Sequence, residues 1–282
     1  MNYNEVNLDL QSVAKRIYYS LIYRSTFYKF LNERYIGELR QTGTPMIEVL
    51  KSNDTSVNVR QTKEIQNRLN PTLMGYSSIK VDLADLAMDY SIRIPILVAG
   101  TDFTNTLEDA MEKKDQAVAT AIDTYGFGVL ANEVTEEAVW NPATEQDYID
   151  TINGLRARLF NNNVFDDYRL GLSATEYGKF VSAITSVLKY ETIAGVEGVD
   201  RGEIAVAYGV GAFPINDSML DDVKGYIFNP IAVVGDTFFD AFVQHNSPQG
   251  FPGYYVMESN ILFGAKVVEP KAIIALKETI SG

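Results

Sequence analysis

The pattern of hydrophobic and polar residues divides the chain into three stretches in a fixed order. A β-rich excursion runs from about Thr44 to Pro95, and an amphipathic helix follows from Thr104 to Tyr125. Near its end the chain carries an apolar segment from Ile261 to Pro270. None of these stretches resembles a catalytic motif. The mixture of helical and strand periods predicts an α+β protein.

The excursion alternates apolar and polar residues in short runs, which is typical of half-solvated strands. The runs are separated by polar or Gly/Pro-containing breaks, and the last of them returns inward as Tyr90–Pro95. Two-stranded hairpins are marginal in water when isolated. Such an arm would therefore need a further surface to lie on.

The helix after the excursion has the clearest period of 3.6 residues in the chain. Thr106 and Asp109 predict a weak capping box at its start, and Gly126 and Gly128 predict its end. Asp115 is assigned to the polar face. The expected apolar face contains Leu107, Ala110, Met111, Lys114, Ala117, Val118, Ala121, Ile122 and Tyr125.

The remaining elements are predicted from shorter patterns. An N-terminal amphipathic helix covers Val6 to Leu21, and its aromatic-rich surroundings fit either a core or a surface that is buried on association. A later helix carries Tyr148, Ile152, Leu155 and Leu159. A strand at Tyr168–Leu172 leads to a helix that opens with the capping box Ser173–Glu176. Further strands are predicted at Gly202–Tyr208, Ala212–Ile215, Tyr226–Phe228 and Ile231–Val234.

Composition and charge narrow the possible functions. The chain has 282 residues with 24 Lys plus Arg against 37 Asp plus Glu, a net charge of −13. Such a surface repels phosphate, so direct nucleic-acid binding is not expected, although an acidic wall could enclose DNA. Cysteine is absent, which excludes disulfides and thiolate chemistry. No signal peptide is visible, and no apolar run approaches the roughly 20 residues of a membrane span.

Candidate chemical groups are few. His245 is the only histidine and is expected at the surface or in a loop, which nearly excludes a His-based metal site or a catalytic triad. The glycine-rich run Gly195–Gly202 lacks the ending of a phosphate loop. Carboxylate pairs are expected on solvated surface, with weak cation binding as their one functional alternative: Asp166-Asp167, Asp221-Asp222, Glu136-Glu137 and Glu108-Asp109. We predict no catalytic, cofactor-binding or metal-binding residue.

Taken together, the order of elements resembles the major capsid proteins of tailed bacteriophages, the Hong Kong 97 fold. The resemblance covers most of the chain and rests on the order and the hydrophobic pattern of the predicted elements rather than on a signature peptide. The quoted segments are the excursion followed by the long helix, the strand and capped helix of Tyr168–Phe180, the strand pair of Gly202–Asn216, and the closing strand of Phe263–Ile273.

The resemblance implies a division of the chain into the parts of that fold. In this family an N-terminal arm leads into an extended hairpin, the E-loop, and a long spine helix belongs to a peripheral or P domain beside an axial or A domain. The implied ranges are 1–43 for the N-terminal arm, 44–95 for the E-loop, 96–141 with 253–282 for the P domain (spine helix 104–125), and 142–252 for the A domain. The resemblance further implies that the stretch from Thr44 to Ile94 projects from the body, is poorly packed by its own chain, and contacts another copy.

The resemblance also implies a function without catalysis. The chain would be a structural subunit, not an enzyme and without cofactors, that assembles through hexamers and pentamers into the icosahedral shell of a tailed phage or prophage. The shell would enclose double-stranded DNA without sequence-specific binding and without a membrane. A separate scaffolding protein and a portal are implied partners, since the chain starts almost directly at the arm. Assembly in the host bacterial cytoplasm and residence in the virion capsid follow.

Two alternatives remain open. An encapsulin has the same fold but encloses an enzyme cargo, and the aromatic N-terminal segment favours the phage interpretation over it. A carboxylate-based hydrolase or lectin-like binding protein rests only on the acidic pairs and the aromatic content. Some capsid proteins cross-link neighbours through a Lys and an Asn; Lys51 or Lys63 could supply the Lys, but no residue identifies its partner, so no cross-link is predicted.

Overall fold

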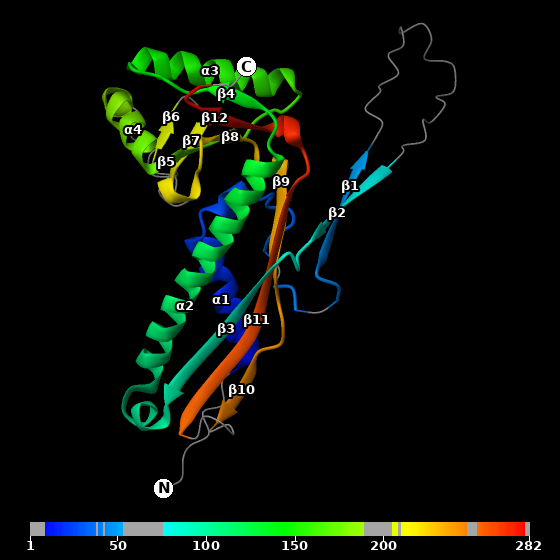
Figure 1. Cartoon of the computed structure of the whole chain (residues 1–282), viewed down its shortest axis with the longest axis vertical. Coiled ribbons are helices and arrows are strands. Elements are labelled where there is room, and N and C mark those ends of the chain that lie inside the picture. The colour runs from blue at the N-terminus through cyan, green and yellow to red at the C-terminus, as the bar shows by residue number, and fades with distance from the viewer. Residues whose placement is uncertain are drawn as a thin grey trace, which may run out of the picture.

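The computed structural model describes residues 9–37, 39–41, 43–52, 76–188, 205–207, 210–246 and 253–279. Helices α1 (Leu10–Arg24) and α2 (Ile96–Glu133) run along the long axis of an elongated body, beside strands β3 (Leu86–Pro95) and β11 (Tyr254–Val267) (Figure 1). A second sheet and two shorter helices form one end, and a hairpin projects to the side. The α+β class predicted from the sequence is confirmed.

The first sheet has the long strand β11 at its centre. On one edge β11 pairs antiparallel with β3, and on the other it pairs with β10 (Val243–Asn246) and then with β9 (Val233–Phe239). The alternation in β3 buries Tyr90, Ile92 and Ile94 in the core. The expectation that the chain up to Ile94 is poorly packed by itself is therefore wrong for β3, because this strand belongs to the body.

The second sheet lies at the end of the body where the C-terminus is found (Figure 1). Helices α3 (Glu145–Asn161) and α4 (Ala174–Leu188) lie beside it. A short 3-10 turn at Asp217–Met219 lies between two of its strands, and those at Pro230–Ala232 and Pro270–Ala272 connect it with the first sheet. Its strand order is β4 (Glu137–Val139), β12 (Ile273–Lys277), β8 (Val223–Phe228), β5 (Arg169–Ser173), β7 (Val210–Ile215) and β6 (Ala205–Ala207).

The two predicted shorter helices are confirmed. All four apolar residues expected on the first of them, Tyr148, Ile152, Leu155 and Leu159, are buried in α3. The Ser173 hydroxyl accepts a hydrogen bond from the Glu176 backbone at 3.2 Å, as expected at the start of α4. The helix-capping rules therefore located this start correctly from local sequence alone.

The sheets divide the chain differently from the predicted domain ranges. Strands β9 and β10 lie inside the range 142–252 yet pair with β11 of the first sheet. Strand β12 lies inside the range 253–282 yet pairs with β8 and β4 of the second sheet. The chain thus also crosses between the sheets within the ranges 142–252 and 253–282, from β8 to β9 and from β11 to β12.

Helix α2 is longer than predicted at both ends. Thr106 and Asp109 lie within it and do not cap its start, and it continues past Gly126 and Gly128 to Glu133. Gly126 does not end the helix but leaves space for a neighbouring side chain, because a Cβ atom there would lie 2.3 Å from the buried Phe27 ring. Asp115 is buried rather than exposed, and the Tyr90 hydroxyl satisfies its carboxylate by donating to it at 2.8 Å.

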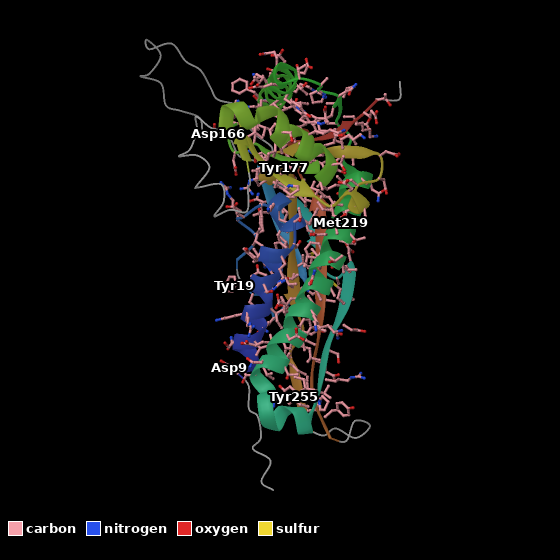
Figure 2. All side chains as sticks on the ribbon, turned by 90° about the vertical axis from the view of Figure 1, so that its left-hand side faces the viewer. Asp9, Tyr19, Asp166, Tyr177, Met219 and Tyr255 are labelled. Carbon is pink, nitrogen blue, oxygen red and sulfur yellow. The ribbon has the colours of Figure 1, made fainter. Side chains whose placement is uncertain are left out.

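The N-terminal region packs into the body. In α1 the residues Ala14, Ile17, Tyr18 and Leu21 are buried, and Asp9 caps the helix start. The apolar face of α1 was expected to be buried either in the core or on association, and it is buried in the protein's own core. Tyr19 and Tyr23 are exposed, and Figure 2 places Tyr19 on the outer side of α1.

A short 3-10 segment after α1, Phe27–Phe30, which we call the aromatic turn, enters the junction between the sheets. The Phe30 ring stacks on Phe228 of the second sheet at 4.0 Å between centroids, and the Phe27 ring meets Phe127 of α2 and Phe263 of the first sheet edge to face. Such aromatic contacts add to area burial. The aromatic turn therefore joins α2 to both sheets.

The contact of Gly126 with the aromatic turn gives a stability prediction. We expect Gly126→Ala to destabilise the protein by about 1–3 kcal/mol, the usual cost of overpacking, because the added methyl meets an enclosed ring. The free energy of unfolding from urea denaturation of the full chain measures this effect.

Gly128→Ala is the matched control on the same helix. No atom lies within 4 Å of a Cβ at Gly128, and this residue is exposed. Alanine there should be neutral or stabilise by up to about 1 kcal/mol through helix propensity. Equal effects of the two substitutions would contradict the close approach at Gly126.

Candidate functional site

The hairpin that leaves the body is the candidate site. It consists of β1 (Met46–Ser52) and β2 (Tyr76–Asp82), which pair antiparallel from Met46 opposite Asp82 to Ser52 opposite Tyr76. Figure 1 shows it extending sideways, away from the long axis. The expected projection is confirmed for these two strands. The middle of the predicted excursion, which includes Lys63, lies outside the described residues.

The two faces of the hairpin differ. Ile47, Val49 and Val81 point to the body and are buried. On the outer face Leu50 is 66% exposed, beside the exposed Glu48 and Lys80. This alternation follows from the period of two along each strand. The outer face therefore presents an apolar side chain that its own chain does not cover.

The end of the hairpin nearest the body, Pro45–Ile47 with Val81–Leu83, is called the hairpin root. A separate small core forms beneath it. The members of this core are Ile47, Val49, Val81, Leu83, Val234, Phe238 and Val268, with Tyr35, Ile79 and Leu262 packed against them. The expectation of poor packing by the same chain is thus wrong at the root, because β9 and the end of β11 supply an apolar surface for it.

A glycine allows the hairpin root to cross the first sheet closely. A Cβ atom at Gly264 of β11 would lie 1.8 Å from the Asp82 carbonyl oxygen. No real side chain tolerates such a distance, so glycine at this position is required for the observed crossing. A second glycine, Gly235 of β9, serves the pairing of β9 with β11, because a Cβ atom there would lie 2.5 Å from the Gly264 carbonyl oxygen.

Lys51 makes a polar contact from the inner face of β1 to the body. Its ammonium donates to the Glu269 carboxylate at 2.9 Å and also to the Val268 carbonyl oxygen. Both acceptors follow directly after β11. Lys51, weighed in the sequence as a cross-linking residue, is thus engaged within its own chain.

A buried carboxylate lies under the hairpin root. Asp236 of β9 is fully buried and accepts hydrogen bonds from the Tyr18 hydroxyl at 3.1 Å and the Thr237 backbone at 2.8 Å. The Arg40 guanidinium forms an ion pair with it at 3.3 Å, and the Tyr28 hydroxyl lies 3.4 Å away. One carboxylate therefore ties α1, the aromatic turn and the segment before the hairpin to β9.

Burial dominates the electrostatics of this group. It raises the pKa of Asp236 from 3.8 to about 7, although the hydrogen bonds from Thr237 and Tyr18 and the charge of Arg40 act in the opposite direction. Burial, followed by the charge of Asp236, also raises the pKa of Tyr18 and Tyr28. The two phenols therefore remain protonated donors to the carboxylate.

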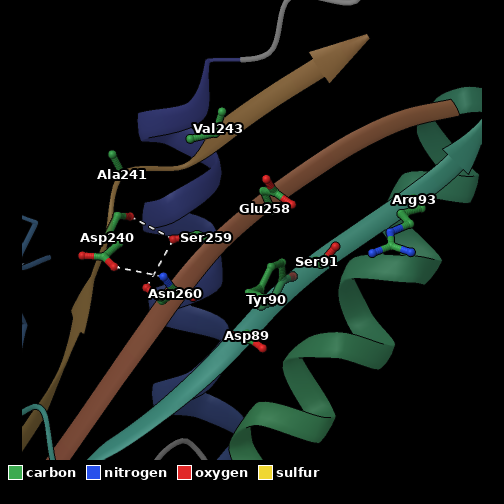
Figure 3. A pocket seen from close by; sticks show the side chains of 10 residues that line it. All are labelled: Asp89, Tyr90, Ser91, Arg93, Asp240, Ala241, Val243, Glu258, Ser259 and Asn260. Carbon is green, nitrogen blue, oxygen red and sulfur yellow. Dashed lines mark hydrogen bonds between the residues drawn. The ribbon is translucent and has the colours of Figure 1, made fainter. Parts of the chain in front are cut away.

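A groove of about 660 Å³ lies on the sheet face opposite α2 (Figure 3). Asp89, Ser91 and Arg93 alternate with the buried residues of β3 and line it, together with Glu258 of β11. Asp240 closes one side, where its carboxylate accepts from the Asn260 amide at 3.2 Å. The charged side chains of the lining are three carboxylates, Asp89, Asp240 and Glu258, and the Arg93 guanidinium.

His245 lies on the edge strand β10 rather than in a loop. Its side chain is 45% exposed, and Nε2 lies 3.8 Å from a Glu258 carboxylate oxygen. The prediction of a surface histidine is confirmed. Within the described ranges no group of three or more His, Asp or Glu side chains is placed to hold a metal ion.

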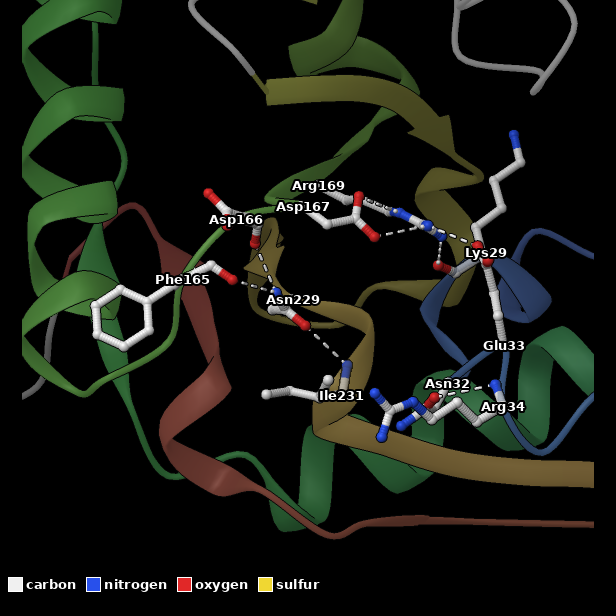
Figure 4. Close-up of polar contacts among 10 residues, drawn as sticks. All are labelled: Lys29, Asn32, Glu33, Arg34, Phe165, Asp166, Asp167, Arg169, Asn229 and Ile231. Atoms are coloured by element: carbon white, nitrogen blue, oxygen red, sulfur yellow. Dashed lines mark hydrogen bonds and ion pairs between the residues drawn. The ribbon is translucent and has the colours of Figure 1, made fainter. Parts of the chain in front are cut away.

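The acidic pair Asp166-Asp167 makes hydrogen bonds and an ion pair with neighbouring residues (Figure 4). The Asp167 carboxylate accepts from the Arg169 guanidinium, which also reaches Glu33 at 2.7 Å. Asp166 and Asp167 have positive φ angles of 61° and 45°. The Asp166 carbonyl oxygen accepts from the Asn229 amide at 2.6 Å. These contacts hold a turn in place.

The other acidic pairs lie apart from Asp166-Asp167 and have contacts of their own. Glu136 pairs with Arg158 at 2.9 Å and Glu137 with Lys277 at 2.5 Å, while Glu108 and Asp109 pair with Arg16 and Lys113. Asp221 and Asp222 line a different hollow with Asp217 and Glu176. The run Gly195–Gly202 lies outside the described residues. The surface expectation for the pairs is confirmed for the described side chains.

Three buried carboxylates were not predicted from the sequence as structural groups. Asp115 and Asp123 of α2 and Asp236 of β9 each accept hydrogen bonds from the N-terminal region or from β3, and Asp123 binds the backbone of Phe27 at 2.8 Å. Burial raises the pKa of Asp115 and Asp123 as well. A single Asp inside the otherwise apolar run Ile231–Phe239 was the signal available for Asp236.

Comparison with known proteins places this architecture. No family model and no curated protein sequence matches the chain. Among solved structures, "Mycobacterium phage Che8" matches with a TM-score of 0.57 and 15% identity over 91% of this chain and 92% of that one. "Capsid structure of the Cyanophage P-SCSP1u" matches with 0.58 and 13%, over 89% of each. "Crystal structure of virus-like particle from Pyrococcus furiosus" matches with 0.51 and 14%, over 95% and 98%.

These likenesses establish the fold. They extend over about nine-tenths of the chain in each case, which includes both sheets and the long helix. The Hong Kong 97-like capsid fold expected from the order of elements is therefore confirmed. In addition, no helix in the described part of the chain is long and apolar enough to cross a membrane.

The buried carboxylate predicts a specific dependence of stability on pH. The folded-state pKa of Asp236 is raised, so its contribution is fully present below the unfolded value near 3.8 and is lost as pH rises through about 7. We expect Asp236→Asn to remove this decline. The difference between the two proteins should amount to a few kcal/mol at most, at about 1.4 kcal/mol per pKa unit.

Urea denaturation at a series of pH values measures this difference. Asp89→Asn, which changes an exposed carboxylate on β3, is the control and should keep the profile of the unmodified protein. Parallel pH profiles for the unmodified protein and Asp236→Asn would contradict the assignment.

Proposed function

We propose that this protein is a structural subunit that self-assembles into the icosahedral capsid shell of a tailed phage or prophage. The capsid fold, which extends over nearly the whole chain, supports the proposal. Hexamers and pentamers of this one chain would form the shell. The proposal requires no catalytic residue, and it agrees with the ion pairs that engage most of the acidic pairs.

The observation that carries the proposal is the outer face of the projecting hairpin. Leu50 is 66% exposed there, and Met46 at the root is 38% exposed. A two-stranded hairpin gains stability when a third surface covers it. In a shell a neighbouring copy supplies this surface, and the contact is heterologous, because the hairpin of one copy meets a different surface of the next.

The charge of the chain fits a container rather than a binder of DNA. A net charge of −13 repels a phosphate backbone, so enclosed double-stranded DNA would not be bound in a sequence-specific way. A scaffolding protein and a portal are the further partners of this proposal. The subunit would assemble in the cytoplasm of the host bacterium and reside in the virion capsid.

We also propose which elements form the parts of the fold. The hairpin β1–β2 corresponds to the E-loop, and α2 corresponds to the spine helix. The first sheet with α2 forms the P domain, and the second sheet with α3 and α4 forms the A domain. The N-terminal arm would comprise the chain before the hairpin, of which α1 and the aromatic turn belong to the core.

An encapsulin-type compartment is the second candidate, because it has the same fold; the phage structures and the virus-like particle among the matches do not favour it over the phage capsid. The two candidates share the shell and differ in its contents. Particles that contain DNA-packaging partners support the phage capsid, whereas particles that retain an enzyme cargo support the compartment.

The proposal predicts that the purified full-length chain, alone or with a scaffolding partner, forms capsomers or shells in electron micrographs. Leu50→Asp should weaken subunit association roughly tenfold or more, because burying a leucine contributes about 1.5–3 kcal/mol. Leu50→Met keeps the apolar surface and is the matched control. Size-exclusion chromatography with light scattering measures the assembled fraction.

The fold of the separate subunit should be unchanged in both variants, since Leu50 is exposed. Equal thermal melting of the unassembled chains checks this. Small monodisperse particles under all conditions, with and without the partner, would contradict the proposed function.

A further inference from the structure

The inner face of β1 contacts the body at two levels. At the hairpin root, Ile47 and Val49 enter the small core beneath it. Further along the strand, Lys51 reaches Glu269 and Val268. Lys51 is opposite Ser77 in the hairpin register, one position before the last described residue of β1. Two separated points of contact fix an angle, whereas one point alone allows rotation about it.

The group that receives Lys51 is itself held firmly. Val268 is buried, and the backbone N–H groups of Val268 and Glu269 both donate to the Ala232 carbonyl oxygen, at 2.8 and 3.1 Å. The Glu269 carbonyl oxygen accepts from Ala272 at 3.0 Å. This segment connects β11 with β12, and therefore the two sheets. The Lys51 ammonium thus meets a carbonyl and a carboxylate on a rigid part of the body.

The root provides the pivot for the hairpin. The backbone of Asp82 lies directly on Gly264 of β11, while the Leu83 backbone N–H closes the root itself by donating to the Pro45 carbonyl oxygen at 2.8 Å. The close approach to Gly264 restrains translation of the hairpin at its base. Its inclination depends on the contacts farther out on the inner face, where Val49 packs in the small core and Lys51 makes the polar contact beyond it.

We infer that Lys51 is a positioning residue, which sets the direction of the hairpin through Glu269 and the Val268 carbonyl. The inference rests on the proposed function only for its consequence, which is that the direction of the hairpin decides where a neighbouring copy is met. The side chains of Lys51 and Glu269 are 32% and 36% exposed. Solvent screening keeps such a pair weak, so it biases the angle without holding the fold together.

The inference is tested by a distance across the pivot in the full-length chain. The chain lacks cysteine. Spin labels can therefore be attached through Ser78→Cys on the outer face of β2 and Ala117→Cys on α2, both at exposed positions. Electron–electron double resonance on labelled chain, diluted with unlabelled chain, gives the distance distribution within one copy.

We expect a single narrow distance peak for the doubly labelled chain that retains Lys51 and Glu269. Lys51→Met should cause the loss of this peak in favour of a broad distribution, because it removes both contacts. Glu269→Gln should broaden the peak less, since the Val268 carbonyl oxygen remains as an acceptor, and the double variant should equal Lys51→Met. The exchanged pair, Lys51→Glu with Glu269→Lys, should restore a narrower peak. A role in folding alone would not give this restoration.

Lys80→Met is the matched control, since it removes a lysine charge from the outer face of the same hairpin. It should leave the narrow peak unchanged. An unchanged peak in Lys51→Met and Glu269→Gln overturns the inference, as does equal broadening in Lys80→Met. Unchanged thermal melting of the variants confirms that the body remains folded.

The outcome is independent of whether shells form, because the distance is measured within one copy. If the unmodified chain never assembles while the peak still depends on Lys51, the proposed function fails and the positioning role stands. If shells form and the distance peak is unchanged in Lys51→Met, the positioning role is wrong while the proposed function stands.

Discussion

Insertion of the aromatic turn between the two sheets is the interaction on which the rest of the structure depends. Phe27 and Phe30 are fully buried and contact α2, β11 and the second sheet together. The chain passes directly between the sheets from β8 to β9 and from β11 to β12, through one short turn in each case. Aromatic side chains bury large areas, so this short segment supplies much of the contact that orients the sheets.

Polar groups fix the aromatic turn in one arrangement. Asp123 accepts from the Ser25 hydroxyl at 2.5 Å and from the backbone of Thr26 and Phe27. A buried carboxylate is costly unless it is hydrogen-bonded, and these three donors satisfy it. From the turn the chain continues along β9, with bridges from Leu31 to Val233 and from Arg40 to Phe238. The position of the hairpin root therefore follows from the position of the turn.

The sequence was sufficient for features that repeat at a fixed period. The helices, the strand alternation of the hairpin and the order of elements follow from local pattern, as the capping of α4 by Ser173 illustrates. Prediction from the sequence failed where a single residue contacts a part of the chain far away in sequence. Gly126 was assigned to a helix end, although the Phe27 ring explains it, and Asp236 was overlooked because its donors lie about two hundred positions earlier. Likewise the contact of Lys51 with Glu269 spans 218 positions.

The hairpin combines a rigid base with an uncovered outer face, and this combination argues for a role in association. A loop that merely connected β1 and β2 would need neither a glycine at a backbone crossing nor a separate small core. A protein that remained monomeric would gain by replacing Leu50 with a polar residue, because an exposed edge with apolar side chains invites association. A heterologous contact also closes into a ring only when the angle between copies is correct. The fixed base is consistent with that geometric requirement, and the exposed face with the need for a partner.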